Sequence, residues 1–448
     1  MASAAEQLAA HINFGQLAKA TELKKRLWFT LGALVIYRFG TYIPLPGIDP
    51  AILQEIVHQQ AGGILGMFDM FAGGAFGRMT IFALGIMPYI SASIILQLLT
   101  VVWPFLEKLS KEGELGRRKI TQYTRYGTIL LSLVQSLGIA VFLERNSAIA
   151  GGYHLVPSPG WGFRLMTMLT LTTGTTFVMW LGEQITERGI GNGISLVIFA
   201  GIIVRIPSAL GQLLELIRTD QFTVFGAIIL LGLIVLATGF TVFMERGQRR
   251  IPIQHARRVV GRRITQGGMS YFPLRVNTAG VMAPIFASSL LMVPYTIGQM
   301  SNNPTVQQFF QDYLSFGGFS YEAVYVALII FFTYFYTAVV INPLDVADNI
   351  KKFGGYIPGI RPGKKTAEHI DRVLARITLV GALYVAGLCV LPTMLSTRLG
   401  VPFRFGGTAL LIVVGVALDT IGQIEAHLVS RQYEGFVKGT RLRGRLGR

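Results

Sequence analysis

The sequence is too apolar for a water-soluble globular protein. Its 448 residues are 52% hydrophobic and 14% charged, with a mean hydropathy of +0.52, whereas soluble domains carry about 25% charged residues. This composition indicates a polytopic membrane protein. The net charge of +17 does not by itself indicate nucleic-acid binding, because membrane proteins commonly gather basic residues in their cytoplasmic loops.

In chain order, the first element is a polar segment, residues 1–26, which ends in three basic residues. No small-residue cleavage site follows the first apolar run, so we expect that run to be retained as a spanning helix. A membrane helix needs roughly 20 predominantly apolar residues. By this measure we predict ten spanning segments, at residues 27–43, 79–103, 120–143, 163–183, 194–216, 222–244, 278–298, 321–342, 373–396 and 407–429.

Between the first two spans lies a short apolar piece, residues 64–71, with glycine pairs at 62–63 and 73–74. Eight helical residues cover only about 12 Å, so this piece cannot cross a bilayer. The span that follows is interrupted by Gly85 and Pro88. A short half-helix, glycine hinges and a broken spanning helix are typical of backbone that lines or closes a cavity inside a membrane protein.

The basic residues predict the orientation. With ten spans, 32 of the 40 Lys and Arg residues fall on one side of the membrane and 8 on the other. Such an asymmetry places both termini in the cytoplasm. We therefore divide the chain into a cytoplasmic N-terminal segment, a first half at 27–216, a second half at 217–429 and a basic cytoplasmic tail at 430–448.

Ten spans can form two halves of five, and a repeat with an odd number of spans must be inverted relative to its partner. The second and seventh spans are interrupted alike, with glycine, then proline, then two serines. These residues are Gly85, Pro88, Ser91 and Ser93 in one, and Gly280, Pro284, Ser288 and Ser289 in the other. Chance similarity of two broken helices is the alternative to a repeat.

Two basic loops of the second half, 245–276 and 345–372, are longer than the others. The alternation of basic and branched residues in the first predicts a hairpin-like finger. Its paired arginines, among them Arg258, Arg262 and Arg263, can make fork-like contacts to phosphates or carboxylates. This predicts docking of a large acidic or RNA-containing partner, although such charges can also serve only to hold a loop in the cytoplasm.

Residues for catalysis or metal binding are not evident. The single cysteine, Cys389, lies in an apolar segment, and the six histidines form no pair at ligand spacing. There is no Walker-type phosphate loop. We therefore expect no catalytic residues, no metal and no cofactor, and we do not expect an enzyme. Few charged residues lie well inside the predicted spans. The main ones are Arg38 and Asp419, and both are near enough to helix ends to reach water.

Isoleucines stand out within two spans. Ile86 and Ile90 share one helix face in the second span, as Ile194 and Ile198 do in the fifth. Spacing alone indicates no more than packing or lipid contact, since any apolar helix has such pairs.

Several long motifs nevertheless resemble the SecY family, the pore subunits of the bacterial general protein-conducting channel. The likeness covers nearly the whole chain in order. The motifs are IPLPG at 43–47, FALGIMPYISASII at 82–95, GEQITERGIGNGIS at 182–195, FGGT at 405–408 and RQYEG at 431–435.

The resemblance implies an all-α polytopic membrane protein, with ten transmembrane helices in two inverted five-helix halves that form a clamshell around an hourglass pore. It implies a plug at 62–77, with the apolar residues Ile64, Leu65, Met67, Phe68, Met70 and Phe71. It also implies a pore ring of isoleucines, at Ile86, Ile90, Ile194, Ile198, Ile285 and Ile412. A branched apolar collar fits loosely around an extended chain and, when closed, is too narrow and too poorly hydrated for ions.

The resemblance further implies a lateral gate between the second and seventh spans, with gate residues Ser91, Gln97, Asn277, Ser288 and Val293. Docking residues on the two basic loops would be Arg258, Arg262, Arg263 and Arg361. The implied partners are the SecE and SecG subunits, the SecA motor ATPase, the ribosome with its rRNA, precursor polypeptides with signal sequences, and the lipid bilayer. The implied location is the bacterial cytoplasmic membrane.

One departure from the family pattern lies in the seventh span, where Ala283 precedes Pro284. We therefore expect the break of that helix one residue later than usual.

Two other functions share parts of this pattern. An inverted-repeat secondary transporter of small solutes would also have broken helices, but it needs a polar site at the midplane. An insertase or scaffold without a pore would leave the glycine-flanked piece unexplained. The interpretation that we favour is a gated conduit for unfolded polypeptide, driven by SecA or the ribosome, that releases apolar segments sideways into lipid.

Overall fold

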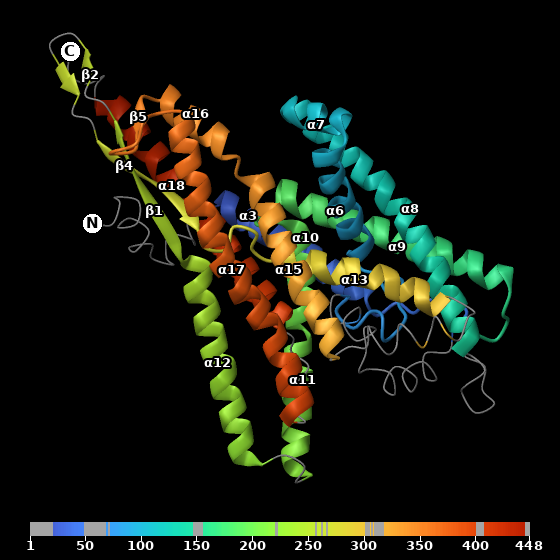
Figure 1. Cartoon of the computed structure of the whole chain (residues 1–448). Coiled ribbons are helices and arrows are strands. Elements are labelled where there is room, and N and C mark those ends of the chain that lie inside the picture. Colours follow the sequence, from blue (N-terminus) through green and yellow to red (C-terminus); the bar gives the residue numbers. More distant parts are fainter. Residues whose placement is uncertain are drawn as a thin grey trace. The chain divides into compact units, whose positions relative to one another are not determined.

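The computed structural model describes residues 21–48, 69, 72–146, 156–219, 223–255, 258–260, 263–265, 268–300, 305, 308, 318–399 and 407–443. These residues belong to two compact units (Figure 1). One unit is Met1–Ser208 with Val416–Arg448, and the other is Ala209–Gly415. Helices α11 (Arg205–Arg218) and α18 (Gly407–Arg443) each begin in one unit and end in the other.

The first unit is helical in its described part. Helix α8 packs against α6 and α9, and α9 also contacts α3 and α10. The bounds are α3 (Thr21–Gly40), α6 (Met87–Val102), α7 (Pro104–Lys111), α8 (Glu114–Asn146), α9 (Trp161–Arg188) and α10 (Gly193–Ile203).

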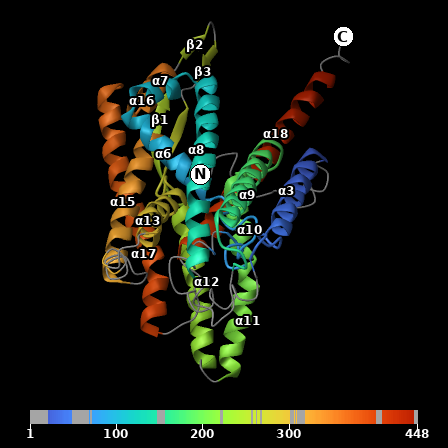
Figure 2. The same ribbon diagram turned by 90° about the vertical axis from the view of Figure 1, so that its right-hand side faces the viewer.

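The second unit repeats this packing order and adds a small sheet. Helix α15 packs against α13 and α17 (Figure 2), as α8 packs against α6 and α9. Strand β1 pairs antiparallel with β4 on one edge and with β5 on the other. The bounds are α12 (Val224–Arg246), β1 (Gln248–His255), β2 (Arg258–Val260), β3 (Arg263–Thr265), β4 (Met269–Arg275), α13 (Met282–Met300), α15 (Phe319–Val340), α16 (Pro343–Lys352), β5 (Gly355–Tyr356) and α17 (Lys364–Leu399).

Each of the ten predicted spans overlaps a helix. Among the described residues, seven helices are long and apolar enough to cross a membrane, and α6 with α7, bent by 98°, adds an eighth if the pair is one span. Helix α3 falls short because it carries Lys24, Lys25, Arg26 and Arg38 within 20 residues. The count of ten spans and the inversion of the halves stay predictions.

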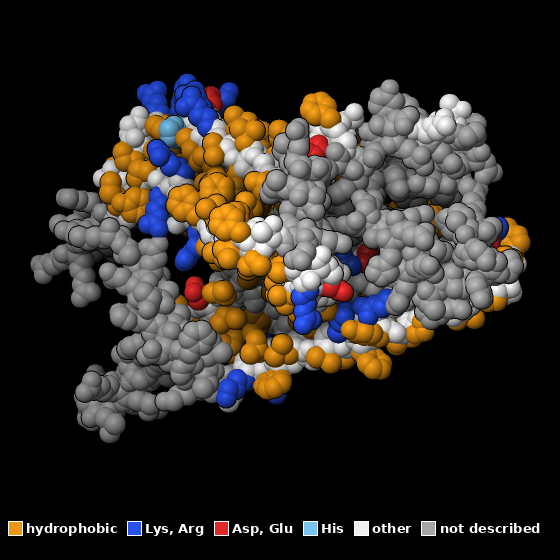
Figure 3. Space-filling view, turned by 90° about the horizontal axis from the view of Figure 1, so that it is seen from below, with side chains coloured by type: hydrophobic (Ala, Val, Ile, Leu, Met, Phe, Trp, Pro, Cys, Tyr) orange, Lys and Arg blue, Asp and Glu red, His pale blue; other side chains and the backbone are white. Residues whose placement is uncertain are grey.

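The surface matches a lipid environment. Hydrophobic side chains cover much of the described part of the face in Figure 3. Helix α12 illustrates this: Val235, Leu236 and Phe243 are each 72% exposed. Apolar side chains exposed in such numbers are unfavourable in water, whereas a helix in lipid satisfies its backbone internally and can present them outward.

The predicted break in the second span is confirmed, but the helix begins later than expected. Residues 79–86, which we predicted as the start of the span, form turns, and α6 begins at Met87 with Pro88 in its first turn. The cause is Gly85, whose φ of +53° cannot continue a right-handed helix. Proline is tolerated in the first turn because its missing N–H would have no partner there.

Helix α13 begins in the same way. Gly280 has a φ of +55°, the helix starts at Met282, and Pro284 lies in its first turn. The break is therefore at Gly280. The extra residue Ala283 shifts the proline by one position within the first turn without creating a separate kink.

Close contacts of glycine with backbone also recur in the two units. A Cβ atom at Gly174 of α9 would overlap the carbonyl oxygen of Ile81, just before α6. A Cβ atom at Gly381 of α17 would overlap the carbonyl oxygen of Val276, just before α13. Because α9 and α17 are the fourth and ninth predicted spans, these equivalent contacts support an internal repeat of five spans.

Candidate functional site

The segment that precedes α6 is anchored by side chains from several elements of the first unit. We call Asp69 and residues 72–86 the α6 leader. Its apolar side chains are buried apart from that of Ile81, which is partly buried, and Ala75 and Ala83 are fully inaccessible. Phe82 of the leader stacks on Tyr37 of α3 and on Phe177 of α9, with ring centroids 6.1 and 5.8 Å apart. The leader is thus packed between two helices before α6 begins.

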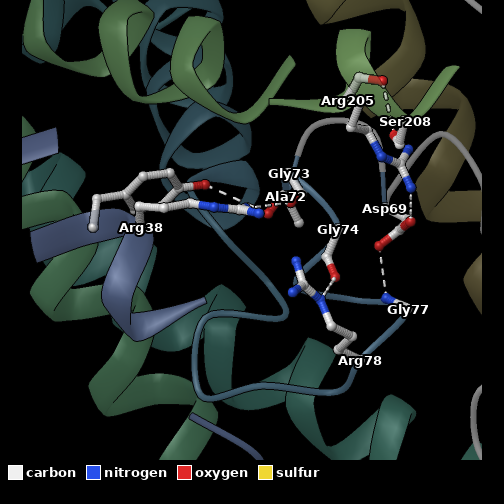
Figure 4. A network of polar contacts seen from close by, with 10 residues as sticks. Arg38, Asp69, Ala72, Gly73, Gly74, Gly77, Arg78, Arg205 and Ser208 are labelled. Carbon is white, nitrogen blue, oxygen red and sulfur yellow. Dashed lines mark hydrogen bonds and ion pairs between the residues drawn. The ribbon is translucent and has the colours of Figure 1, made fainter. Parts of the chain in front are cut away.

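Arg38, at the end of α3, fixes one side of the leader (Figure 4). Its Nη1 donates to the carbonyl oxygen of Gly73 over 3.0 Å. Its Nη2 donates to the Tyr42 hydroxyl over 2.7 Å. We predicted that Arg38 would reach past the helix end to water. The Arg38 side chain is partly exposed, and it also satisfies a backbone carbonyl of the leader, which is the kind of partner that an arginine near apolar surroundings requires.

Asp69 fixes the other side of the leader. Its Oδ1 accepts the backbone N–H of Gly77 over 2.6 Å, and its Oδ2 forms an ion pair with Nη2 of Arg205, the first residue of α11 (Figure 4). The Asp69 side chain is 11% exposed and that of Arg205 37%. A carboxylate this buried is stable in its charged form only when it is paired and hydrogen-bonded.

Our sequence analysis missed this pair. Arg205 lies near the middle of the predicted fifth span, and Asp69 is the one charged residue in the piece 64–71. The available signal was the rule that a charge inside a membrane segment needs a partner, applied to both residues.

A third arginine, Arg78, closes the leader on itself. Its Nε donates to the carbonyl oxygen of Gly74 over 3.1 Å. The guanidinium groups of Arg78 and Arg38 lie 4.3 and 4.7 Å from the ring centroid of Tyr42. The aromatic face is attractive to both cations, so Tyr42 joins the two arginines that hold the loop.

The predicted ring residues are divided between the two units. Ile86, at the end of the leader, Ile90 on α6 and Ile198 on α10 are buried, and Ile194 is partly buried. In the second unit, Ile285 of α13 and Ile412 of α18 are 3% and 1% exposed. That the six residues form one ring stays a prediction.

The predicted gate residues make their hydrogen bonds within their own units. Gln97 donates to Ser93 one turn earlier on α6, and Ser288 donates to the carbonyl oxygen of Ile285. Asn277 Nδ2 donates to Glu245 at the end of α12 over 2.6 Å, and its Oδ1 accepts the N–H of Gly280. Ser91 is partly buried, and the side chain of Val293 lies outside the described residues.

The predicted finger is confirmed as a hairpin. In β1 and β4, Gln248 pairs with Arg275 and Gln254 with Met269, and β2 pairs with β3 further along the loop. Strand β5 comes from the second basic loop and pairs with β1. The two loops that we predicted separately therefore form a single sheet, packed on an apolar cluster that includes Ile251, Leu274, Ile357, Ile370 and Leu374.

Of the predicted docking residues, Arg361 lies in the second basic loop, a few residues after β5, and Arg258 and Arg263 lie in the separate two-stranded sheet of β2 and β3. Arg361 is exposed in a turn between Gly359 and Gly363, both of positive φ, and its carbonyl oxygen accepts the Thr366 hydroxyl. The backbones of Arg258 and Arg263 lie in β2 and β3. Arg262 lies outside the described residues.

The six apolar residues predicted for the plug also lie outside the described residues. Among the residues that are described, no group of three or more His, Cys, Asp or Glu side chains is placed to hold a metal ion.

Comparison with known proteins identifies the family. The family model for SecY matches residues 80–421. The protein translocase subunit SecY of Escherichia coli strain K12 is 50% identical over 426 residues, which cover 94% of this chain and 96% of that protein. The chain belongs to the SecY family. The bacterial relatives and the apolar helices indicate a multi-pass protein of the bacterial inner membrane.

Solved channels of the SecY and Sec61 type share this fold. A SecY channel studied for the role of its plug domain in the closed state has a TM-score of 0.62 and 19% identity, and it covers 92% of each chain. Sec61 in the canine ribosome-channel complex has a TM-score of 0.59 and 16% identity, covering 92% of this chain and 93% of its own. At these identities the likeness shows the fold alone.

Proposed function

We propose that this chain is the pore-forming subunit of a bacterial protein translocase. It conducts unfolded, signal-bearing polypeptides across the cytoplasmic membrane and releases apolar segments into lipid through a lateral gate. The observation that carries this proposal is 50% identity to a translocase subunit over almost the full length of both chains. The channel supplies a path and no catalysis, and both termini lie in the cytoplasm.

The pore would be closed by two devices in series. The six isoleucines Ile86, Ile90, Ile194, Ile198, Ile285 and Ile412 form the collar. Residues 62–77 form the plug, and a solved SecY relative is described as having a plug domain that stabilises its closed state. The anchored α6 leader supports this assignment, since it connects the plug residues directly to the helix that carries Ile90.

The lateral gate would lie between α6 and α13, with Ser91, Gln97, Asn277, Ser288 and Val293 along the seam. Both helices begin after a glycine of positive φ, so each can tilt about a break that is already present. Interhelical hydrogen bonds of polar side chains in membranes contribute only about 0.6 to 2 kcal/mol each. An apolar signal helix can displace bonds of this strength.

The sheet of β1, β4 and β5 would be the cytoplasmic docking surface. Arg258, Arg262, Arg263 and Arg361 carry the positive charge that an acidic motor surface or rRNA recognises. The partners proposed are SecA, the ribosome, and the companion subunits SecE and SecG. A solved Sec61 relative is a ribosome-channel complex, and the pairing of β1 with β5 supports a single surface that such a partner could bind.

The test is transport by the reconstituted channel. Vesicles containing the chain with its companion subunits receive an unfolded, signal-bearing precursor, with SecA and ATP present or absent. We expect the precursor to become protease-protected only when both are present. Absence of protection, with every component shown active on an established channel, would contradict the proposal.

A charge-reversal variant tests the docking surface in the same assay. Arg361→Glu should reduce SecA-driven protection at least tenfold, because it replaces an exposed donor by a repulsive charge. Lys365→Glu is the matched control, since Lys365 is exposed four residues later, in the first turn of α17, and its Nζ already pairs with Glu368 over 3.4 Å. Equal loss in both variants would indicate a general charge effect and contradict a specific role for Arg361.

A further inference from the structure

The structure carries a second inference, which rests on the proposed function. We propose that the ion pair between Asp69 and Arg205 is a latch that holds the α6 leader, and with it the plug, in the closed position. Arg205 and Asp69 are then positioning residues for gating. Breaking their pair shifts the channel toward a leaky state without removing any residue of the pore ring.

The location of the pair is the first argument. Asp69 belongs to the proposed plug, whereas Arg205 begins α11, directly after the helix α10 that carries Ile194 and Ile198. The pair therefore joins residues 136 positions apart in the sequence. It is a contact between the plug and the pore wall, and a plug that moves away must break it.

The carboxylate of Asp69 also links this contact to the shape of the leader. One oxygen holds the Gly77 N–H and so closes the loop, and the other holds Arg205. The Asp69 carbonyl oxygen accepts the N–H of Gly74 over 2.9 Å. Because these bonds close the loop on Asp69, the leader cannot leave its position unless the contact of Asp69 with Arg205 breaks.

A second contact lies along the same face of the helix. A Cβ atom at Gly73 would lie 2.7 Å from the Cα of Gly201, four residues before Arg205. Residues four apart lie one above the other on a helix, and Val204 between α10 and α11 keeps helical dihedrals. The leader thus lies against one face of α10 and the start of α11, with a close backbone contact at Gly201 and a charged contact at Arg205.

The chemistry suits a reversible latch better than permanent packing. A partly buried ion pair strongly opposes loss of one partner, because the remaining charge is left unpaired. If both partners separate together into the water-filled pore of an open channel, however, each charge is resolvated. The contact therefore stabilises the closed position while the leader is seated, and the separated charges carry only a small free-energy penalty once water surrounds them.

The experiment is a double-mutant cycle read as ion conductance. The full channel with its companion subunits is placed in planar bilayers without precursor, and resting conductance is measured for Asp69→Asn, Arg205→Gln and the double variant. Asp69→Asn keeps one oxygen that can accept the Gly77 N–H, and it replaces the oxygen that pairs with Arg205 by an uncharged NH2 donor. We expect each single variant to raise conductance roughly tenfold, the change in population that about 1.4 kcal/mol produces. The double variant should leak no more than Arg205→Gln alone, because no charge is then left unpaired.

The chain offers a matched control. Glu144 has the same pattern of contacts as Asp69: one oxygen accepts the Gly160 N–H over 3.0 Å and the other accepts from Arg164 over 2.6 Å. Both residues belong to the first unit, and they pair with each other and not with the leader. Glu144→Gln with Arg164→Gln should therefore leave conductance unchanged, although it removes a comparable ion pair.

Each outcome has a distinct meaning. Deleting residues 64–71 should raise conductance if the plug assignment is right, and an unchanged baseline would contradict that part of the proposed function. A leaky deletion with tight single variants would overturn the latch alone. Leakage of the Glu144 control equal to that of Arg205→Gln would also overturn the latch, because loss of stability would then explain both. Folded protein is verified in every case by size-exclusion chromatography.

Discussion

The segments that lead into α6 and α13 share one backbone plan and differ in how they are held. Both pass a glycine of positive φ and place a proline in the first helical turn. Both run beneath a glycine of another helix, Gly174 or Gly381. The α6 leader, however, is held by Arg38 and Arg205 from two other elements, whereas the α13 side is held by the amide of Asn277.

This difference is consistent with the separate roles that we propose for the two halves. Close glycine contacts and helix breaks are requirements of the backbone, so they persist in both copies of a repeat. The side-chain anchors are free to diverge. Under the proposed function, charged anchors suit a segment that stays seated against the pore wall, and the neutral amide of Asn277 suits a helix that moves as a gate. Substitutions at the shared and at the divergent positions therefore test whether the two halves are equivalent in backbone and different in anchoring.

The largest effect is expected where the two halves agree. Gly174→Ala and Gly381→Ala would each drive a methyl group into a backbone carbonyl, of Ile81 and Val276 respectively. A backbone carbonyl cannot move aside as the end of a flexible side chain can, so we expect each substitution to destabilise the protein by about 3 kcal/mol. The measurement is thermal unfolding of the purified channel in detergent.

Helical glycines on the same two helices provide the control. A methyl group added at Gly162 of α9 or at Gly387 of α17 would have no atom within 4 Å. Their replacement by alanine should be neutral or stabilising by up to about 1 kcal/mol, the difference in helix propensity. A Gly381 variant as stable as the Gly387 variant would break the equivalence between the halves.

The second effect tests the anchor of the gate side. Asn277→Ala removes the donor to Glu245 and the acceptor for the Gly280 N–H. We expect a loss of about 2 kcal/mol, because one of these bonds involves a charged group. Asn277→Asp keeps the acceptor but sets two carboxylates against each other, so it should be at least as damaging. A harmless Asn277→Asp would show that the contact with Glu245 contributes little.

The third effect concerns the two helix breaks. Gly85→Ala and Gly280→Ala force alanine into the left-handed region, at φ of +53° and +55°. We expect each to cost roughly 1 to 2 kcal/mol. Steric clashes should not make the two losses of stability differ. A methyl group at Gly85 makes only ordinary contacts, the nearest at 3.5 Å, and one at Gly280 makes none within 4 Å. Unequal melting shifts would mean that the two breaks are not equivalent.

The sequence predicted the features that local chemistry determines. Apolar runs located a helix in every predicted span, glycine with proline located the breaks before α6 and α13, and alternating residues located the β1–β4 hairpin. Each depends on residues that are near one another in the chain. The family motifs supplied the identity, because long identical runs specify a family far more narrowly than periodicity does.

The anchors could not be predicted in this way. The pairing of Asp69 with Arg205 joins residues 136 positions apart, and the local sequence around either residue does not predict which residue it pairs with. The union of the two basic loops through β1 and β5 is also a long-range pairing, and β5 has only two residues. Such contacts depend on how helices pack, which periodicity does not encode.

The smallest effect concerns Tyr42, whose ring lies against both Arg38 and Arg78. Tyr42→Leu removes the aromatic face and the hydroxyl that accepts from Arg38, while the bond from Arg38 to the Gly73 carbonyl remains. An exposed cation–π contact contributes about 0.5 to 1 kcal/mol, and the expected loss of stability is of that size. Tyr42→Phe keeps the ring and should recover most of it. If Tyr42→Phe is as unstable as Tyr42→Leu, the hydroxyl and not the ring holds the arginines. In either case the resting conductance should rise less than in Arg205→Gln, because Tyr42 supports the leader only through arginines that keep their own bonds to its carbonyl oxygens.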